Sequence, residues 1–267
     1  MLLAVDVGNT QTVIGLFGTE DGQPPVGSGA ERDLLDHWRI ATSAQRTSDE
    51  LALLVQEFLG FHGFSFDEDV DGVALCSSVP SITAAVREMT KRYFGFEAIV
   101  VEPGVKTGMP ILYENPKEVG ADRIADAVAA YDLYGGPTIV VDFGTATTLE
   151  AISASGEYLG GAIIPGVDIS LEALFSRAAA LRKVELVEPR NVIGKNTIES
   201  IQSGALYGFG GQVDGIARRI VHEIGEATVV ATGGLAAVIA PYSEMITELE
   251  PWLTLHGLRL IFEKNQK

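Results

Sequence analysis

The sequence predicts an α/β protein with two domains, and three observations support this prediction. Strand-like apolar runs alternate with segments of helical periodicity along the whole chain. A length of 267 residues exceeds what one hydrophobic core usually organises. A short strand-turn pattern also occurs twice, once near residue 6 and once near residue 142, so we expect one copy to open each domain. We place the domains at 1–117 and 118–267.

The first half contains short apolar strands and two amphipathic helices. Thr47-Ser48-Asp49-Glu50 forms a capping box that begins a helix ending near Gly60, and a second helix is expected over 80–94. Gly18 to Asp36 is rich in glycine, proline and acidic residues, which is typical of a long hairpin loop. The strands are expected at 2–5, 12–17, 38–41, 70–77 and 98–101.

The second half repeats this alternation of strands and helices. A helix over 121–134 ends at Gly135-Gly136, the usual C-cap residues. Further strands are expected at 138–141, 159–164 and 228–231. Helices are expected over 169–182, from Asn196 or Thr197 to about Gly225 with breaks at glycines, and after the sequence ATGGL.

Composition excludes several classes of partner. The chain has 36 acidic and 19 basic residues, a net charge of −17, and no Lys/Arg cluster, so neither nucleic acid nor an anionic membrane is expected to bind it. No window approaches the roughly 20 apolar residues of a membrane span, and the N-terminus does not resemble a signal peptide. A cytoplasmic location is therefore expected. The single cysteine, Cys76, excludes an intramolecular disulfide and is interpreted as a buried structural thiol.

The two copies of the repeat are LLAVDVGNTQTVIGLF and TIVVDFGTATTLEAIS. In each, an apolar strand ends at an aspartate, Asp6 or Asp142, and a glycine and a threonine-rich turn follow. Glycine lets the backbone approach a ligand, and the turn offers donors for phosphate oxygens. Two carboxylates beside a triphosphate need a cation between them, so Mg²⁺ is expected. Chance similarity, and aspartates that merely cap their own turns, are the alternatives.

A third glycine turn, Thr232-Gly233-Gly234, follows the strand expected at 228–231. The three turns together resemble the superfamily of actin, the heat-shock ATPases and the sugar kinases. That resemblance implies two related actin/ribonuclease H-like domains with mixed sheets and an ATP cleft between them. Neither of the common nucleotide motifs, GxxxxGK[ST] and GxGxxG, is present.

The segment YENPKEVGADRIADAVAAY contains the candidate catalytic base. Gly120-Ala121-Asp122-Arg123 places Asp122 and Arg123 in the first turn of a helix. An aspartate there could accept the proton of an attacking hydroxyl, and the arginine could hold a carboxylate or the transferred phosphoryl group. Stabilisation of the helix N-terminus by Asp122 is the alternative.

The combination of DVGNTQT, Tyr113 with NPKEVGADR, DFGTATT, GGAIIPG, GKNTIESIQSG and ATGGL closely resembles type III pantothenate kinase. The resemblance runs in order across essentially the whole chain. It implies ATP-dependent phosphorylation of the 4′-hydroxyl of pantothenate, the first step of coenzyme A synthesis. It also implies a homodimer, Mg²⁺ and a required monovalent cation, K⁺ or NH₄⁺.

The resemblance also implies roles for individual residues. Asp122 would be the general base, Asp6 would lie on the magnesium side, directly or through water, and Asp142 would bind the monovalent cation, which revises the assignment of both acids to Mg²⁺. The ATP contacts would be Asp6, Val7, Gly8, Asn9, Thr10, Gln11, Thr12, Val13 and Thr145. The pantothenate contacts would be Tyr113, Gly120, Ala121, Asp122, Arg123 and Thr197, the last near the dimer partner.

Three alternatives stay open on the sequence. Another small-molecule kinase of the superfamily, acting on acetate or a sugar, would keep the ATP turns but lose the GADR and GKNT elements. A regulatory protein, such as a transcription accessory factor, would keep the fold and lose Asp122 or Asp142. A heat-shock-type ATPase would need a much longer chain. The stretch from Gly18 to Asp36 is longer than the family's usual first hairpin and is expected to be a surface insertion.

Overall fold

The computed structural model describes residues 1–18, 27–178 and 181–266. The chain forms two compact units, each of which is described by itself. The first consists of Met1–Pro110, Glu114–Ala129 and Trp252–Lys267, and the second of Ile111–Tyr113 and Ala130–Pro251. The sequence predicted a single boundary after residue 117. The structure divides the chain differently, because the segments Glu114–Ala129 and Trp252–Lys267 pack with the N-terminal residues.

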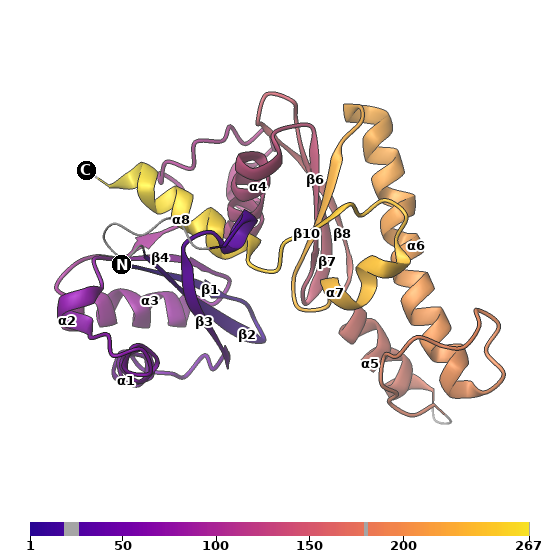
Figure 1. The fold of residues 1–267 in the computed structure, drawn as a ribbon, viewed down its shortest axis with the longest axis horizontal. Coiled ribbons are helices and arrows are strands. Elements are labelled where there is room, and N and C mark those ends of the chain that lie inside the picture. Colours follow the sequence, from indigo (N-terminus) through magenta and orange to yellow (C-terminus); the bar gives the residue numbers. More distant parts are fainter. Residues whose placement is uncertain (19–26, 179–180, 267) are drawn as a thin grey trace. The chain divides into compact units, whose positions relative to one another are not determined.

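The first unit is built on a five-stranded mixed sheet (Figure 1). Its strand order is β3-β2-β1-β4-β5, in which β1 pairs antiparallel with β2 and parallel with β4. The strands are β1 (Leu2–Val7), β2 (Gln11–Phe17), β3 (Leu34–Ala41), β4 (Gly72–Ser77) and β5 (Ile99–Val100). The helices are α1 (Ser48–Gly60), α2 (Phe66–Asp69), α3 (Pro80–Met89), α4 (Ala121–Tyr134), whose last turn belongs to the second unit, and α8 (Leu253–Asn265).

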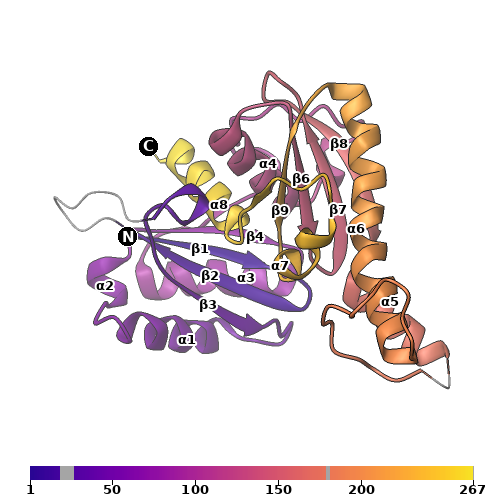
Figure 2. The same ribbon diagram turned by 45° about the vertical axis from the view of Figure 1, so that its right-hand side comes forward.

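The two faces of this sheet carry different side chains. Side chains alternate between faces along a strand, so Leu3, Val5 and Val7 of β1 point to one side and join a core formed with α1 and α3. The opposite face carries small residues, and there α8 lies directly on the sheet (Figure 2). A Cβ added to Gly72 would lie 2.0 Å from the ring of Phe262 in α8. Asp6 lies on this second face by strand alternation, as does Cys76, its partner on β4.

The second unit contains a sheet of the same design. Its order is β10-β9-β6-β7-β8, and β6 again pairs antiparallel with the next strand, β7, and parallel with β9. The expected pair of related mixed sheets is therefore confirmed, and β6–β7 takes the place of β1–β2. The strands are β6 (Thr138–Phe143), β7 (Ala146–Ile152), β8 (Tyr158–Pro165), β9 (Thr228–Thr232) and β10 (Glu248–Leu249). The helices are α5 (Val167–Arg177), α6 (Thr197–Ile224) and α7 (Ala236–Ile239).

Helix α6 is one uninterrupted helix of 28 residues, so the expected breaks at its glycines were wrong. Its buried residues, among them Leu206, Phe209 and Val213, pack on the face of the sheet formed by Ile139, Val141 and Phe143. This packing offsets the roughly 1 kcal/mol that each interior glycine costs a helix. Asn196 is the N-cap, and its side chain accepts a hydrogen bond of 2.9 Å from the backbone of Glu199.

Other elements differ from the sequence expectations. The third strand begins at Leu34 rather than near residue 38, so the hairpin loop is shorter, and residues 19–26 of the expected insertion lie outside the described residues. Helix α5 ends at Arg177 rather than at residue 182. The helix after Gly234 is a single turn, α7, and β10 and α8 were not predicted. The capping box at Thr47 and the bounds of α4 are confirmed.

Within the described residues, no helix is both long and apolar enough to cross a membrane.

The close approach of α8 and α4 gives a stability test at Gly257. A Cβ added there would lie 2.0 Å from the carbonyl oxygen of Ala125, a backbone atom that cannot rotate away. Gly257→Ala should therefore lower the free energy of unfolding by about 1–3 kcal/mol, measured by denaturant titration. The matched control is Gly211→Ala, also in a helix but with no atom within 4 Å of the added Cβ, which should be neutral or slightly stabilising. Equal effects of the two variants would contradict the close packing.

Candidate functional site

The Asp6 carboxylate lies at the end of β1 and is held by a thiol. Cys76 is the register partner of Asp6 on β4, and its thiol donates a hydrogen bond of 3.2 Å to Asp6 Oδ1. The pKa of Asp6 is raised to about 6, mainly because burial disfavours the charged form; the hydrogen bond from Cys76 opposes this rise, and the nearby charge of Asp122 adds to it. Burial also raises the pKa of the Cys76 thiol well above its usual range, so the sulfur stays protonated and remains a donor.

The turn after Asp6 is braced by hydrogen bonds from neighbouring segments. The backbone N–H of Gly8 donates to Gln11 O at 3.0 Å and closes the turn. The hydroxyl of Thr42 donates to Gly8 O, and the hydroxyl of Ser78 donates to Val7 O. Thr12 is buried, and its hydroxyl hydrogen-bonds that of Thr42 at 2.8 Å. The side chains exposed around the turn are those of Asn9, Thr10 and Gln11.

Asp122 is fixed at the first turn of α4. Its Oδ1 accepts a hydrogen bond of 2.8 Å from the backbone N–H of Arg123. A Cβ added to Gly120 would lie 2.4 Å from the same oxygen, so only glycine leaves room for this carboxylate. The charge of Asp122 acts on both Asp6 and Cys76. The first unit therefore brings two aspartates, predicted from separate motifs, to one place.

Asp142 occupies the matching strand end in the second unit. Its register partners are Thr148 on β7 and Thr232 on β9. A Cβ added to Gly233 would lie 2.2 Å from Asp142 Oδ1, and one added to Gly144 would lie 3.2 Å from Oδ2. Gly233 also has a φ of +91°, which disfavours other residues. The absence of a Cβ at both positions therefore leaves room for the Asp142 carboxylate itself.

Two threonines of the second repeat have buried hydroxyl groups. Thr147 Oγ1 and Thr148 Oγ1 make no hydrogen bond within the described part of the chain. Thr148 is on the same sheet face as Asp142, whereas Thr147 pairs with Phe143 on the core face. Thr145 lies in the turn itself, where a Cβ at Gly166 would be 2.2 Å from its carbonyl oxygen.

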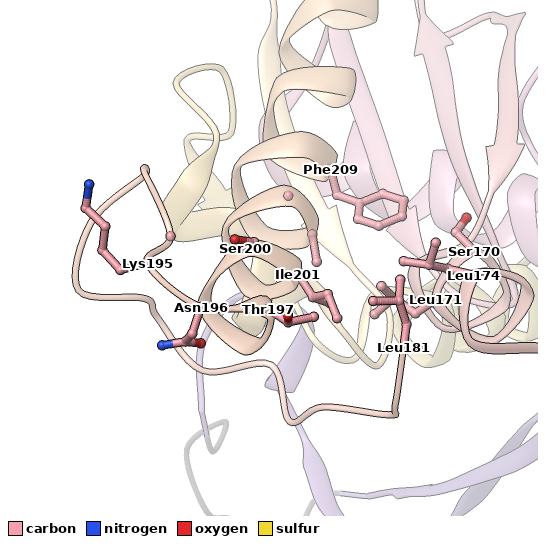
Figure 3. Close-up of a pocket in the computed structure, with 13 residues that line it drawn as sticks. Ser170, Leu171, Leu174, Leu181, Lys195, Asn196, Thr197, Ser200, Ile201 and Phe209 are labelled. Atoms are coloured by element: carbon pink, nitrogen blue, oxygen red, sulfur yellow. The ribbon is translucent and has the colours of Figure 1, made fainter. Parts of the chain in front are cut away.

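Thr197 and Tyr113 lie in different parts of the second unit. Thr197 is the first residue of α6 and lines a cavity of about 760 Å³ between α5 and α6 (Figure 3). The cavity is mainly apolar, with Leu171, Leu174 and Phe209 among its walls and Lys195 and Asn196 near its rim. Tyr113 lies against β8, where its ring meets that of Tyr158 edge to face at 6.3 Å between centroids.

Of the predicted site residues, the first unit contains the loop from Asp6 to Val13 and the segment Gly120 to Arg123, and the second contains Asp142, Thr145, Tyr113 and Thr197. The expected ATP cleft between the two domains remains a prediction.

The described residues contain no group of three or more His, Cys, Asp or Glu side chains that could hold a metal. The Asp6 carboxylate nevertheless fits Mg²⁺, which usually binds through one or two carboxylates plus water and substrate phosphates. Asp142 fits a cation as a carboxylate at the end of β6, where Gly144 and Gly233 carry no Cβ that would crowd its oxygens.

Sequence reasoning missed the residues that support these groups. Cys76 was interpreted as a structural thiol; it is buried, but it also contacts the Asp6 carboxylate. Thr42 and Ser78, which brace the first loop, come from segments far along the chain. The parallel pairing of β1 with β4 would have identified Cys76, but the strand register was not predicted.

Comparison with known proteins agrees with this geometry. The family model described as type III pantothenate kinase matches residues 2–219. The chain belongs to the type III pantothenate kinase family. A type III pantothenate kinase of Streptomyces avermitilis is 56% identical over 273 residues, which cover 99% of this chain and 98% of the relative.

Two solved structures share the fold at low sequence identity. A Campylobacter jejuni protein assigned to the Baf family of transcriptional activators has a TM-score of 0.59 at 18% identity, with 98% of each chain covered. Component A of the (R)-2-hydroxyglutaryl-CoA dehydratase of Acidaminococcus fermentans has a TM-score of 0.57 at 14% identity, with 99% of each chain covered. A sugar kinase shares the fold as well: a 2-dehydro-3-deoxygalactonokinase of Sinorhizobium meliloti has a TM-score of 0.55 at 14% identity, with 99% of this chain and 97% of that chain covered. In this type III pantothenate kinase the family match includes every predicted site residue and ends before α8.

The half-buried Asp6 carboxylate gives a test of stability against pH. Its pKa in the folded protein, about 6, is above the ordinary 3.8, so folding favours the neutral form and burying the charge costs stability above pH 6. In the absence of Mg²⁺, Asp6→Asn should raise the free energy of unfolding at pH 7.5 by up to about 3 kcal/mol. The gain should disappear as the pH falls from about 6 to about 4, because wild-type Asp6 then becomes protonated.

Thermal unfolding at several pH values checks this, with the exposed Asp132→Asn as the control that should show no such dependence. An Asp6→Asn protein less stable than wild type at pH 7.5 would contradict the costly burial of this charge.

Proposed function

We propose that the protein transfers the γ-phosphoryl group of ATP to the 4′-hydroxyl of pantothenate, which is the first step of coenzyme A synthesis. Membership of the type III pantothenate kinase family supports the reaction. The observation that carries it in this chain is the pair of carboxylates in the first unit. Asp6 ends the first strand-turn copy, and Asp122 is fixed close to it at the start of α4.

In this proposal Asp122 is the general base. Its Oδ1 is engaged by the backbone N–H of Arg123, which fixes the carboxylate and leaves Oδ2 to accept the proton of the acceptor hydroxyl. The arginine side chain belongs to the same turn and provides a planar set of donors for a carboxylate or a phosphoryl group. Phosphoryl transfer depends mainly on positioning and charge stabilisation, which these groups can provide.

The ATP contacts proposed from the family are the loop from Asp6 to Val13 and Thr145. The loop is held in shape by hydrogen bonds to its own carbonyl oxygens, and Asn9, Thr10 and Gln11 are exposed around its turn, as a phosphate-binding loop requires. The acceptor contacts proposed are Tyr113, Gly120 to Arg123 and Thr197.

Two cations complete the proposal. Mg²⁺ would be held on the Asp6 side, largely through water and phosphate oxygens, and would neutralise charge on the phosphates. A monovalent cation, K⁺ or NH₄⁺, would bind at Asp142, a carboxylate at the end of a strand that is bordered by Gly144 and Gly233.

We also propose a cytoplasmic homodimer. Exposed apolar side chains gather between the end of β8 and the first turn of α6, where Thr197 lies, and an exposed apolar surface of this kind commonly marks an interface. These residues are Ile163, Ile169, Leu174, Val187, Val192, Ile193 and Ile198.

A coupled assay of ADP release tests the proposed reaction. With ATP, Mg²⁺ and K⁺ supplied, ADP release should depend on pantothenate, and replacing K⁺ by NH₄⁺ should preserve activity while Na⁺ alone should not. Absence of pantothenate-dependent release would reject the reaction. Release that depends instead on acetate or a sugar would identify a different kinase of the superfamily, and equal rates in K⁺ and Na⁺ would reject the role of Asp142.

Replacement of the proposed base tests the mechanism. Asp122→Asn keeps the shape of the side chain and removes only proton acceptance, so kcat should fall by about 10²- to 10⁴-fold while ATP and pantothenate still bind by calorimetry. Asp132→Asn, an exposed change on the same helix, should leave kcat unchanged. An Asp122→Asn enzyme with full turnover would remove Asp122 from the role of base.

A further inference from the structure

A short segment of the second unit, Ile111–Tyr113, is attached to β8. Ile111 forms a parallel bridge with Tyr158, and the backbone N–H of Leu112 donates to Tyr158 O at 2.8 Å. The residues on both sides of this segment belong to the first unit. One residue of β8, Tyr158, therefore determines where this segment lies.

The ring of Tyr113 rests on two neighbours in β8. Tyr158 meets it edge to face, and a Cβ added to Gly160 would lie 3.3 Å from both Cδ2 and Cε2 of the Tyr113 ring. Such a distance is shorter than most real Cβ contacts, so a side chain at position 160 would require the Tyr113 ring to move by a few tenths of an ångström. Gly160 also has a φ of +117°, a conformation that other residues rarely adopt. Tyr113 itself remains partly exposed.

Tyr158 is in turn anchored by a buried acid. Both Tyr158 and Glu150 are fully buried, and the tyrosine hydroxyl donates to Glu150 Oε2 at 2.5 Å. An acid is costly to bury unless it is hydrogen-bonded, so the pair specifies one position for the Tyr158 ring. By strand alternation Glu150 shares its sheet face with Thr148 and Asp142. The anchor therefore lies on the face of the sheet that carries the proposed cation site.

We propose that Tyr158 is a positioning residue which, together with Gly160, holds the Tyr113 ring in place and so sets the affinity of the enzyme for its acceptor, a branched hydroxy-acid amide of the pantothenate class. This inference rests on the proposed function, in which Tyr113 lines the acceptor pocket. Tyr158 acts only through Tyr113, because its own ring is completely buried. If Tyr158 had only a structural role, replacing it would lower the stability of the protein and would not change the KM for one substrate more than the KM for the other.

Gly160→Ala is the decisive variant, and steady-state kinetics with each substrate varied in turn is the measurement. The KM for pantothenate should rise by about three- to tenfold, as expected when a contact residue is slightly displaced, while the KM for ATP changes less than about twofold. Gly225→Ala is the matched control, because Gly225 also has a positive φ, of +91°, but no atom lies within 4 Å of the added Cβ. This control should leave both KM values unchanged.

Tyr158→Phe provides a second, independent variant. It keeps the ring and removes the hydroxyl that binds Glu150. It should therefore raise the KM for pantothenate, but by a smaller factor than Gly160→Ala. If this protein fails to fold because Glu150 loses its donor, Gly160→Ala still decides the question.

Tyr113→Ala separates failure of the inference from failure of the proposed function. If Tyr113→Ala raises the KM for pantothenate but Gly160→Ala behaves like its control or raises both KM values equally, the positioning role is overturned and the function stands. If Tyr113→Ala changes nothing, the placement of Tyr113 is overturned together with the inference, although wild-type activity still supports the reaction. A wild-type protein without pantothenate-dependent ADP release overturns both.

Discussion

Each half of this protein depends on one constraint: a carboxylate must lie at the end of a central strand that pairs antiparallel on one side and parallel on the other. Asp6 on β1 and Asp142 on β6 both satisfy it. The antiparallel partner returns directly after the turn, so the turn is short and tightly bonded. The parallel partner ends at the same edge of the sheet and brings a second functional segment there. In the first sheet that segment brings Cys76 to Asp6, and in the second it brings Thr232 and Gly233 to Asp142.

The two sites differ in what surrounds the carboxylate. Asp6 is half-buried, and the loss of solvation raises the pKa of its carboxyl to about 6, with a further rise from the charge of Asp122 and an opposing effect of the Cys76 hydrogen bond; a bound cation would relieve this cost. Asp142 is bordered by Gly144 and Gly233, and a Cβ added to either glycine would lie close to a carboxylate oxygen. One strand design thus places an aspartate in two different surroundings.

Much of the fold could be read from the sequence, because its signals are local. The capping box at Thr47 and the glycines after Tyr134 gave helix ends that the structure confirms. The duplication of the strand-turn unit correctly indicated two related sheets. The unbroken course of α6 depends instead on packing against the sheet, which overrides the cost of its glycines, and α8 had no recognised local signal.

The candidate site was predictable to a similar extent. Motifs identified the residues that would act directly, such as Asp6, Asp122 and Asp142, because their chemistry is recognisable at short range. The residues that hold them were not found, because they approach only through strand register and loop packing. Cys76 reaches Asp6 across 70 positions, and Thr42 reaches Gly8 across 34.

The return of α8 to the first sheet also affects how the chain can be made. The face of β1 that carries Asp6 is covered by residues 253–265, while the opposite face is covered by helices that are complete by residue 89. During synthesis, therefore, the N-terminal sheet emerges from the ribosome with one side exposed, and it stays so until nearly all of the second unit has been translated. In a protein with this topology the first unit cannot complete its folding until the second unit has been translated. Chaperone binding to the nascent chain should therefore be concentrated on the small-residue face that later receives α8.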